Sequence, residues 1–153
     1  MGLFDFIFGK KKNKTITLEE ANKENEAYIK ENPTPIDDEN GMMRKAASLL
    51  SSGEFKASME LYQQMAEKFP DKKGLYLSQV GANQYFLGQY EAAIDTYLQA
   101  KEAGFEESMI DDNVFEACEA LYKQRNEKMF LEKYISLFPN GNHLKKANKL
   151  LSK

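Results

Sequence analysis

Histidine and cysteine, the side chains that most often serve as catalytic bases and nucleophiles, occur once each in this sequence, as His143 and Cys118. A cysteine becomes a nucleophile when a nearby base or positive charge stabilises its thiolate. The pattern brings no histidine to Cys118, which stands in an apolar stretch and is expected to be a small, buried packing residue. His143 stands beside Lys145 and Lys146 and is expected to be solvated. Neither residue is therefore predicted to act in catalysis.

The remaining residue types also lack the spacing that enzymes and cofactor sites require. No histidine or cysteine cluster has metal-ligand spacing. The carboxylates of "EEANKENE" (19–26) and "FEES" (105–108) are typical of solvated helix faces. The glycines stand singly, so no loop could hold a phosphate. The sequence predicts a protein that is not an enzyme and has no cofactor and no metal.

Composition and charge narrow the class of protein further. The chain has 153 residues, enough for one domain, and a net charge of −3, which argues against nucleic acid as a partner. A single cysteine excludes a disulfide framework. No apolar stretch approaches the roughly 20 residues of a spanning helix, and the N-terminal lysines follow the apolar run, unlike those of a signal peptide. These features predict a cytoplasmic protein.

Two stretches 35 residues apart are alike: "GEFKASMELY" (53–62) and "GQYEAAIDTY" (88–97). Upstream, Met42 and Ala46 align with Leu77 and Gly81. The aligned positions within the two stretches are Gly53 with Gly88, Phe55 with Tyr90, Ala57 with Ala92, and Tyr62 with Tyr97. A weaker third copy places Val114, Ala117, Cys118 and Leu121 on one helical face.

This pattern resembles the tetratricopeptide repeat, a pair of antiparallel helices of about 34 residues. The resemblance implies an all-α fold of stacked helical hairpins, a right-handed α-solenoid, with three units at 39–73, 74–108 and 109–141 and a C-terminal capping helix over 142–153. Gly53 and Gly88 are expected in the turns between helices. Gly81 and Ala93 are expected where the two helices of a unit cross, and residues 103–112 are expected to form a long connector.

The first helix of each repeat lines the concave groove of this family, so the resemblance also implies a binding surface. Met43 and Ala47 stand where some members carry a basic clamp for a peptide carboxylate, so this groove is expected to take an apolar helix or an extended segment. An alternative is that these residues pack beneath a predicted helix over 17–30. The residues that the resemblance places in the groove are Met43, Ala47, Leu50, Ser78, Ala82, Tyr85, Phe115, Glu119 and Tyr122.

The first 38 residues differ in character from the repeats. Residues 15–38 contain an acidic helix that starts with a capping box from Thr17 to Glu20, followed by a linker with Pro33 and Pro35. Residues 1–14 combine large apolar side chains with lysines, which suits peripheral contact with an anionic membrane. Docking into the protein's own groove, a homo-oligomer contact and disorder are alternatives. The contact residues of this segment are Leu3, Phe4, Phe6, Ile7, Phe8, Lys10, Lys11, Lys12 and Lys14.

These observations predict a non-enzymatic adaptor that binds a protein or peptide in the concave groove, with its N-terminus recruiting it to a membrane surface. A chaperone-like holder of an aggregation-prone partner and an accessory subunit of an enzyme complex are the alternatives.

Overall fold

The computed structural model describes Lys23, Ala27 and residues 38–152, and the chain divides into two compact units, 1–35 and 36–153. Lys23 and Ala27 are helical and exposed. The predicted contact segment 1–14, the capping box and the proline linker lie outside the described residues.

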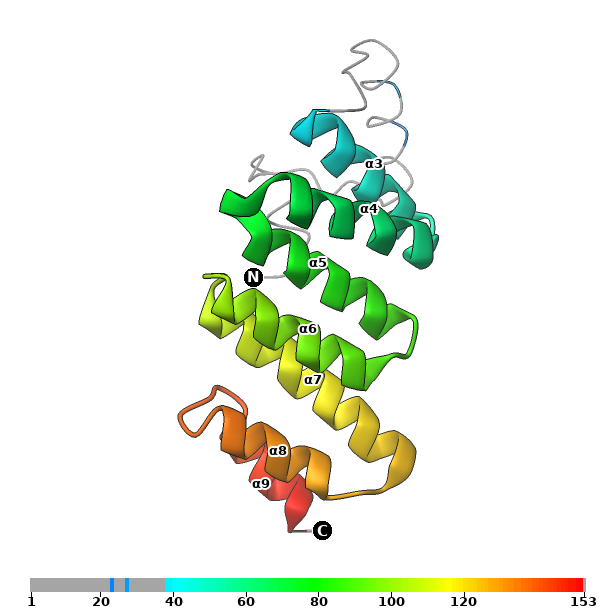
Figure 1. The fold of residues 1–153 in the computed structure, drawn as a ribbon. Coiled ribbons are helices and arrows are strands. Elements are labelled where there is room, and N and C mark those ends of the chain that lie inside the picture. Colours follow the sequence, from blue (N-terminus) through cyan, green and yellow to red (C-terminus); the bar gives the residue numbers. More distant parts are fainter. Residues whose placement is uncertain (1–22, 24–26, 28–37, 153) are drawn as a thin grey trace, which may run out of the picture. The chain divides into compact units, whose positions relative to one another are not determined.

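The described part of the second unit is all-α, as predicted, and its consecutive helices pack against one another in chain order (Figure 1). Short turns join them, so neighbouring helices run in opposite directions. The elements are α3 (Glu39–Ser51), α4 (Phe55–Lys68), the 3₁₀ turn η1 (Pro70–Lys72), α5 (Lys73–Phe86), α6 (Tyr90–Glu102), α7 (Glu107–Arg125), α8 (Met129–Leu137) and α9 (Leu144–Leu151).

Residues with left-handed backbone angles end several of these helices. Gly53 (φ 81°) follows α3 and Gly88 (φ 73°) follows α5, as the sequence predicts. Gly104 (φ 87°) follows α6 in the same way, and Asn126 (φ 57°) ends α7. Glycine adopts this conformation without a steric cost, and asparagine tolerates it better than most residues.

The prediction of a long connector over 103–112 is wrong. Helix α7 begins at Glu107, so the connector is short and the expected unit boundary at residue 109 falls inside the helix. The acidic stretch folds as helix because Ile110 is fully buried and Asp111 is held by hydrogen bonds from Tyr134 and Asn142.

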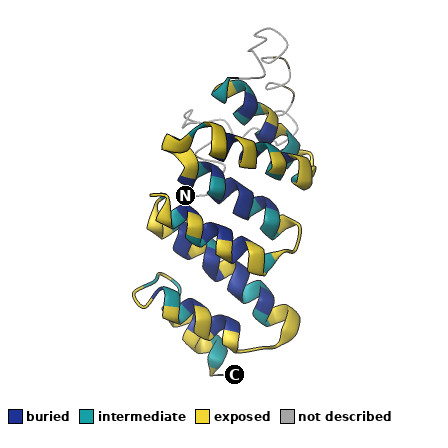
Figure 2. Cartoon of the chain, in the orientation of Figure 1, coloured by how far each residue is buried: buried dark blue, intermediate teal, exposed yellow. Residues whose placement is uncertain are grey.

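Buried side chains form two clusters along the stack, and the half-buried Leu77 packs against both. Figure 2 colours the buried residues of the helices dark blue. Among the buried residues, Tyr76 also donates a hydrogen bond to Oε1 of Glu39. Oε2 of the same carboxylate accepts a hydrogen bond from Nζ of Lys72 at 2.8 Å. These bonds, that from Lys72 first, lower the pKa of Glu39 and join the start of α3 to the start of α5. The first cluster consists of Met42, Ala46, Tyr62, Met65, Ala66, Tyr76 and Val80. The second consists of Ala93, Ile94, Tyr97, Ala100, Ile110, Val114, Phe115, Ala117, Cys118, Leu121, Phe130, Leu131, Tyr134, Phe138 and Ala147.

Two glycines let α5 approach α6 closely. A Cβ at Gly81 would lie 2.6 Å from Cε1 of Tyr97, so the tyrosine ring occupies the space that a side chain would need. Ala93, expected at the same crossing, is fully buried. A Cβ at Gly74 would lie 2.9 Å from the carbonyl oxygen of Ala100 and 2.9 Å from the amide nitrogen of Phe105. At Gly74 the neighbours are backbone atoms, which cannot move aside as a side chain can.

Gly74→Ala is therefore expected to destabilise the protein by about 1–2 kcal/mol, because a clash worth about 1–3 kcal/mol outweighs the gain of up to about 1 kcal/mol in helix propensity. Urea denaturation followed by circular dichroism measures the change. Ser48→Ala, at an exposed position in α3, is the control and should change stability by less than about 0.5 kcal/mol. A Gly74→Ala protein that is as stable as the wild type would contradict the close approach of α5 to α6.

Candidate functional site

Most of the predicted groove residues are accessible, but two of them are buried. Ser78 is 4% exposed and donates a hydrogen bond to the carbonyl of Leu75 at 2.7 Å. Phe115 is 1% exposed. The prediction that these two side chains line a groove is therefore wrong. The partly exposed residues are Met43, Ala47 and Leu50 on α3, Ala82 and Tyr85 on α5, and Glu119 and Tyr122 on α7.

Phe115 is buried because the residues around α9 cover it. The His143 imidazole stacks on its ring, with centroids 4.4 Å apart and planes 8° apart. Nζ of Lys146 lies 4.9 Å from the ring centre, and Tyr134 contacts the ring edge-on at 5.0 Å. The C-terminal helix and the residues before it thus cover the groove position that the sequence predicted for Phe115.

Glu119 is held by lysines from two helices. Its Oε2 lies 3.2 Å from Nζ of Lys123 on the same helix and 3.1 Å from Nζ of Lys146 on α9. Burial favours the neutral carboxyl group, but the hydrogen bonds and charges of the two lysines outweigh burial and lower its pKa. Glu119 and its two lysines together carry a net charge of +1.

Tyr85, near the end of α5, packs against the second cluster and is surrounded by other aromatic rings. Its ring is 5.2 Å from that of Tyr90 and 5.8 Å from that of Phe86. Burial raises the pKa of Tyr85, and the negative charges of Glu116 and Glu119 on α7 raise it further. We refer to Tyr85, Phe86, Leu87 and Tyr90 as the aromatic patch.

The aromatic patch contains the strongly exposed apolar side chains of the central hairpin. Phe86 is 53% exposed although it stacks on Phe55 at 5.1 Å, and Leu87 is 38% exposed. Sequence reasoning identified Tyr85 but missed its neighbours. The signal in the sequence was the apolar pair Phe86–Leu87 directly before Gly88, at the end of the helix, where the core does not require an apolar residue.

The sequence predicts a solvated His143, but this residue belongs to a hydrogen-bond network that fixes α9. Its Nε2 lies 2.8 Å from Oδ1 of Asp112, and its backbone N–H donates to the Tyr134 hydroxyl at 3.1 Å. Tyr134 donates to Oδ1 of the buried Asp111 at 2.5 Å, and the backbone N–H of Asn142 donates to Oδ2 at 2.6 Å. Burial, followed by the bond to Asp111, raises the pKa of Tyr134. These hydrogen bonds hold the loop before α9 against α7 and α8.

In residues 38–152, Lys23 and Ala27, no three histidine, cysteine, aspartate or glutamate side chains are grouped closely enough to hold a metal ion. Within the same residues no helix has the length and apolar character needed to cross a membrane.

Cys118 is fully buried, and burial raises the pKa of its thiol to about 11. At about pH 8 the native protein should therefore react with iodoacetamide about a hundredfold more slowly than the chain unfolded in guanidinium, since the thiolate is the reactive form. The native rate should rise about tenfold per pH unit until the thiol ionises. Mass spectrometry of quenched samples measures both rates. Rapid labelling of the native protein would contradict the packing of α7.

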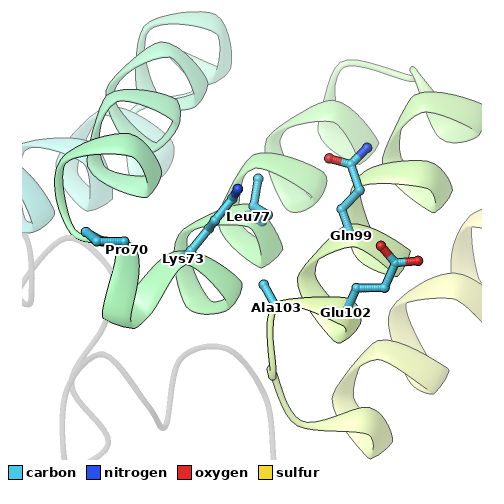
Figure 3. Close-up of a pocket in the computed structure, with 6 residues that line it drawn as sticks. All are labelled: Pro70, Lys73, Leu77, Gln99, Glu102 and Ala103. Carbon is cyan, nitrogen blue, oxygen red and sulfur yellow. The ribbon is translucent and has the colours of Figure 1, made fainter.

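A hollow that the sequence analysis did not predict lies between α4, α5 and α6. Lys73 and Leu77 of α5 face it together with Pro70, while Gln99 and Glu102 come from α6 on the other side (Figure 3). A second depression shares Pro70, Lys73 and Leu77 and extends to Gln63, Ala66 and Glu67 of α4. We call the two together the α5 hollow. It could not be foreseen because its lining comes from three helices.

Comparisons with protein-family models, with curated proteins and with solved structures find no match to this chain.

Proposed function

We propose that this chain is a non-enzymatic protein-interaction module that binds a peptide or helical segment of another protein on the surface shared by α5 and α7. The observation that carries the proposal is the aromatic patch. Phe86 and Leu87 are exposed beside the half-buried Tyr85, although a monomer gains nothing from leaving large apolar side chains in water. Partly exposed aromatic side chains of this kind dominate the energy of many protein interfaces.

Three features support a tetratricopeptide-like arrangement of the helices. Helices α3 and α4, α5 and α6, and α7 and α8 follow one another as hairpins, with glycine turns in the first two. Small residues stand where helices approach closely, as Gly81 does against Tyr97. Helix α9 has one fully buried residue, Ala147, and exposed lysines, as a polar cap on an open stack requires. In this arrangement α5 and α7 are the first helices of adjacent units and present a shared binding surface.

The chemistry of this surface favours an apolar segment. Ala82 leaves space, Tyr85 and Tyr122 supply large stiff side chains, and Glu119 is already paired with two lysines. The module is proposed to act as a cytoplasmic adaptor, and residues 1–14 remain the segment proposed for membrane recruitment.

Selection from a random peptide library against the immobilised full chain tests this function. We expect enriched peptides with several large apolar residues, and we expect synthetic copies to lose affinity for a Tyr85→Ala protein. The failure to enrich any peptide, or enriched peptides that are indifferent to both Tyr85 and Tyr122, would overturn the proposal.

A further inference from the structure

We propose that the α5 hollow is a second docking surface, and that it takes a partner segment in which large apolar side chains are followed closely by lysine or arginine. The two depressions meet at Pro70, Lys73 and Leu77, so the hollow runs from α4 across the start of α5 to the end of α6. Ala66, Leu77 and Ala103 supply its apolar lining. An apolar side chain of a partner can be buried against them.

The charges around this apolar lining define the rest of the partner's chemistry. Glu67 lies on the α4 side and Glu102 on the α6 side, and both are exposed. Within the described residues, neither carboxylate is paired with a basic side chain, in contrast to Glu39, Glu91 and Glu119. Complementary charge favours a partner with cations beside its apolar anchor, and it also speeds association.

Lys73 stands between these two glutamates and makes no ion pair with a described side chain. Its ammonium group donates hydrogen bonds only, so a partner can satisfy it with a backbone carbonyl or a single carboxylate. The partner segment is therefore expected to be basic overall and to carry one acceptor near its apolar residues.

The α5 hollow is independent of the surface in the proposed function. Ala82 follows Lys73 by nine positions, which at about 100° per residue puts the two on opposite sides of α5. Tyr85 follows Leu77 by eight positions, which puts them about 80° apart around α5 and about 12 Å apart along its axis, so partners at these two residues are separated mainly along the helix. A chain with both surfaces can bridge an apolar segment and a basic one.

A synthetic peptide with the sequence of residues 2–14, "GLFDFIFGKKKNK", is a suitable probe because it has this chemistry. We expect the fluorescently labelled peptide to bind the full chain saturably in an anisotropy titration. The double variant Glu67→Lys/Glu102→Lys should bind it at least tenfold more weakly. The double variant Glu127→Lys/Glu132→Lys has the same change in charge elsewhere on the surface and should bind within about twofold of the wild type.

Three further controls test whether the loss of binding comes from the α5 hollow. Circular dichroism checks the fold of each variant, and Glu67→Gln/Glu102→Gln, which removes the charges without reversing them, replaces the lysine variant if that protein unfolds. Tyr85→Ala should leave unchanged the lysine-dependent part of peptide binding, because that part depends on Glu67 and Glu102. A peptide with glutamine in place of each lysine should bind at least tenfold more weakly.

The absence of saturable binding, or an equal loss in both charge-reversed proteins, would overturn the inference. Binding that is lost in Tyr85→Ala but kept in Glu67→Lys/Glu102→Lys would assign the peptide to the α5–α7 surface and would also overturn it. Because the proposed function depends on Tyr85 and this inference depends on Glu67 and Glu102, the failure of either is distinguishable from the failure of the other.

Discussion

Tyr97→Ala is expected to lower the free energy of unfolding by about 3–5 kcal/mol, the usual cost of truncating a buried aromatic side chain. Tyr97 is 3% exposed, and its ring fills the space that Gly81 leaves by having no Cβ. Removing the ring creates a cavity between α5 and α6, and two helices that are joined at such a crossing cannot close it without a shift of their backbones.

Urea denaturation of the full chain, followed by circular dichroism, measures this loss. Gln99→Leu is the matched control, because Gln99 lies two residues further along α6 and is exposed, so its substitution should change stability by no more than about 0.5 kcal/mol. Equal midpoints for the two variants would mean that Tyr97 does not fill this crossing and that the alignment of the two repeats is wrong.

The features that the sequence did predict are the local and repeated ones. Aligning residues 53–62 with 88–97 pairs Tyr62 with Tyr97, and both are buried, while the two glycines that open these stretches have positive φ. Such positions are predictable because a glycine that ends a helix and an aromatic residue on its apolar face depend on neighbours within about ten residues.

The buried groove positions could not be predicted, because distant residues decide them. Phe115 is on the expected face of α7, but His143, 28 positions later, stacks on it. The early start of α7 likewise depends on Asp111, whose partners Tyr134 and Asn142 lie 23 and 31 residues away. From the sequence alone, a polar residue whose partners are so distant is predicted to lie in a loop, because the bonds that bury it are not visible.

The exposure of the aromatic patch has the same origin. An apolar residue at the end of α5 is consistent with a core position, and only the packing of the described helices shows that Phe86 and Leu87 are accessible. Sequence periodicity reports which face of a helix is apolar. It does not report which part of that face another helix covers.

Tyr85→Ala is expected to weaken binding of the selected peptide by about 2 kcal/mol or more, which is about thirtyfold in Kd. The Tyr85 ring contacts both Phe86 and Tyr90 of the aromatic patch, so the peptide is expected to lose its largest contact when the ring is removed. Isothermal titration calorimetry on the full chain measures the affinity.

The loss belongs to binding only if the fold survives the substitution. Tyr85 is half-buried, so its truncation should cost less stability than that of Tyr97, and the variant should remain folded at the temperature of the titration. Tyr85→Phe separates the ring from the hydroxyl and should retain most of the affinity, because the aromatic surface supplies the contact. If Tyr85→Ala binds as tightly as the wild type while Glu67→Lys/Glu102→Lys does not, the peptide occupies the α5 hollow, and the surface shared by α5 and α7 is not the site of the proposed function.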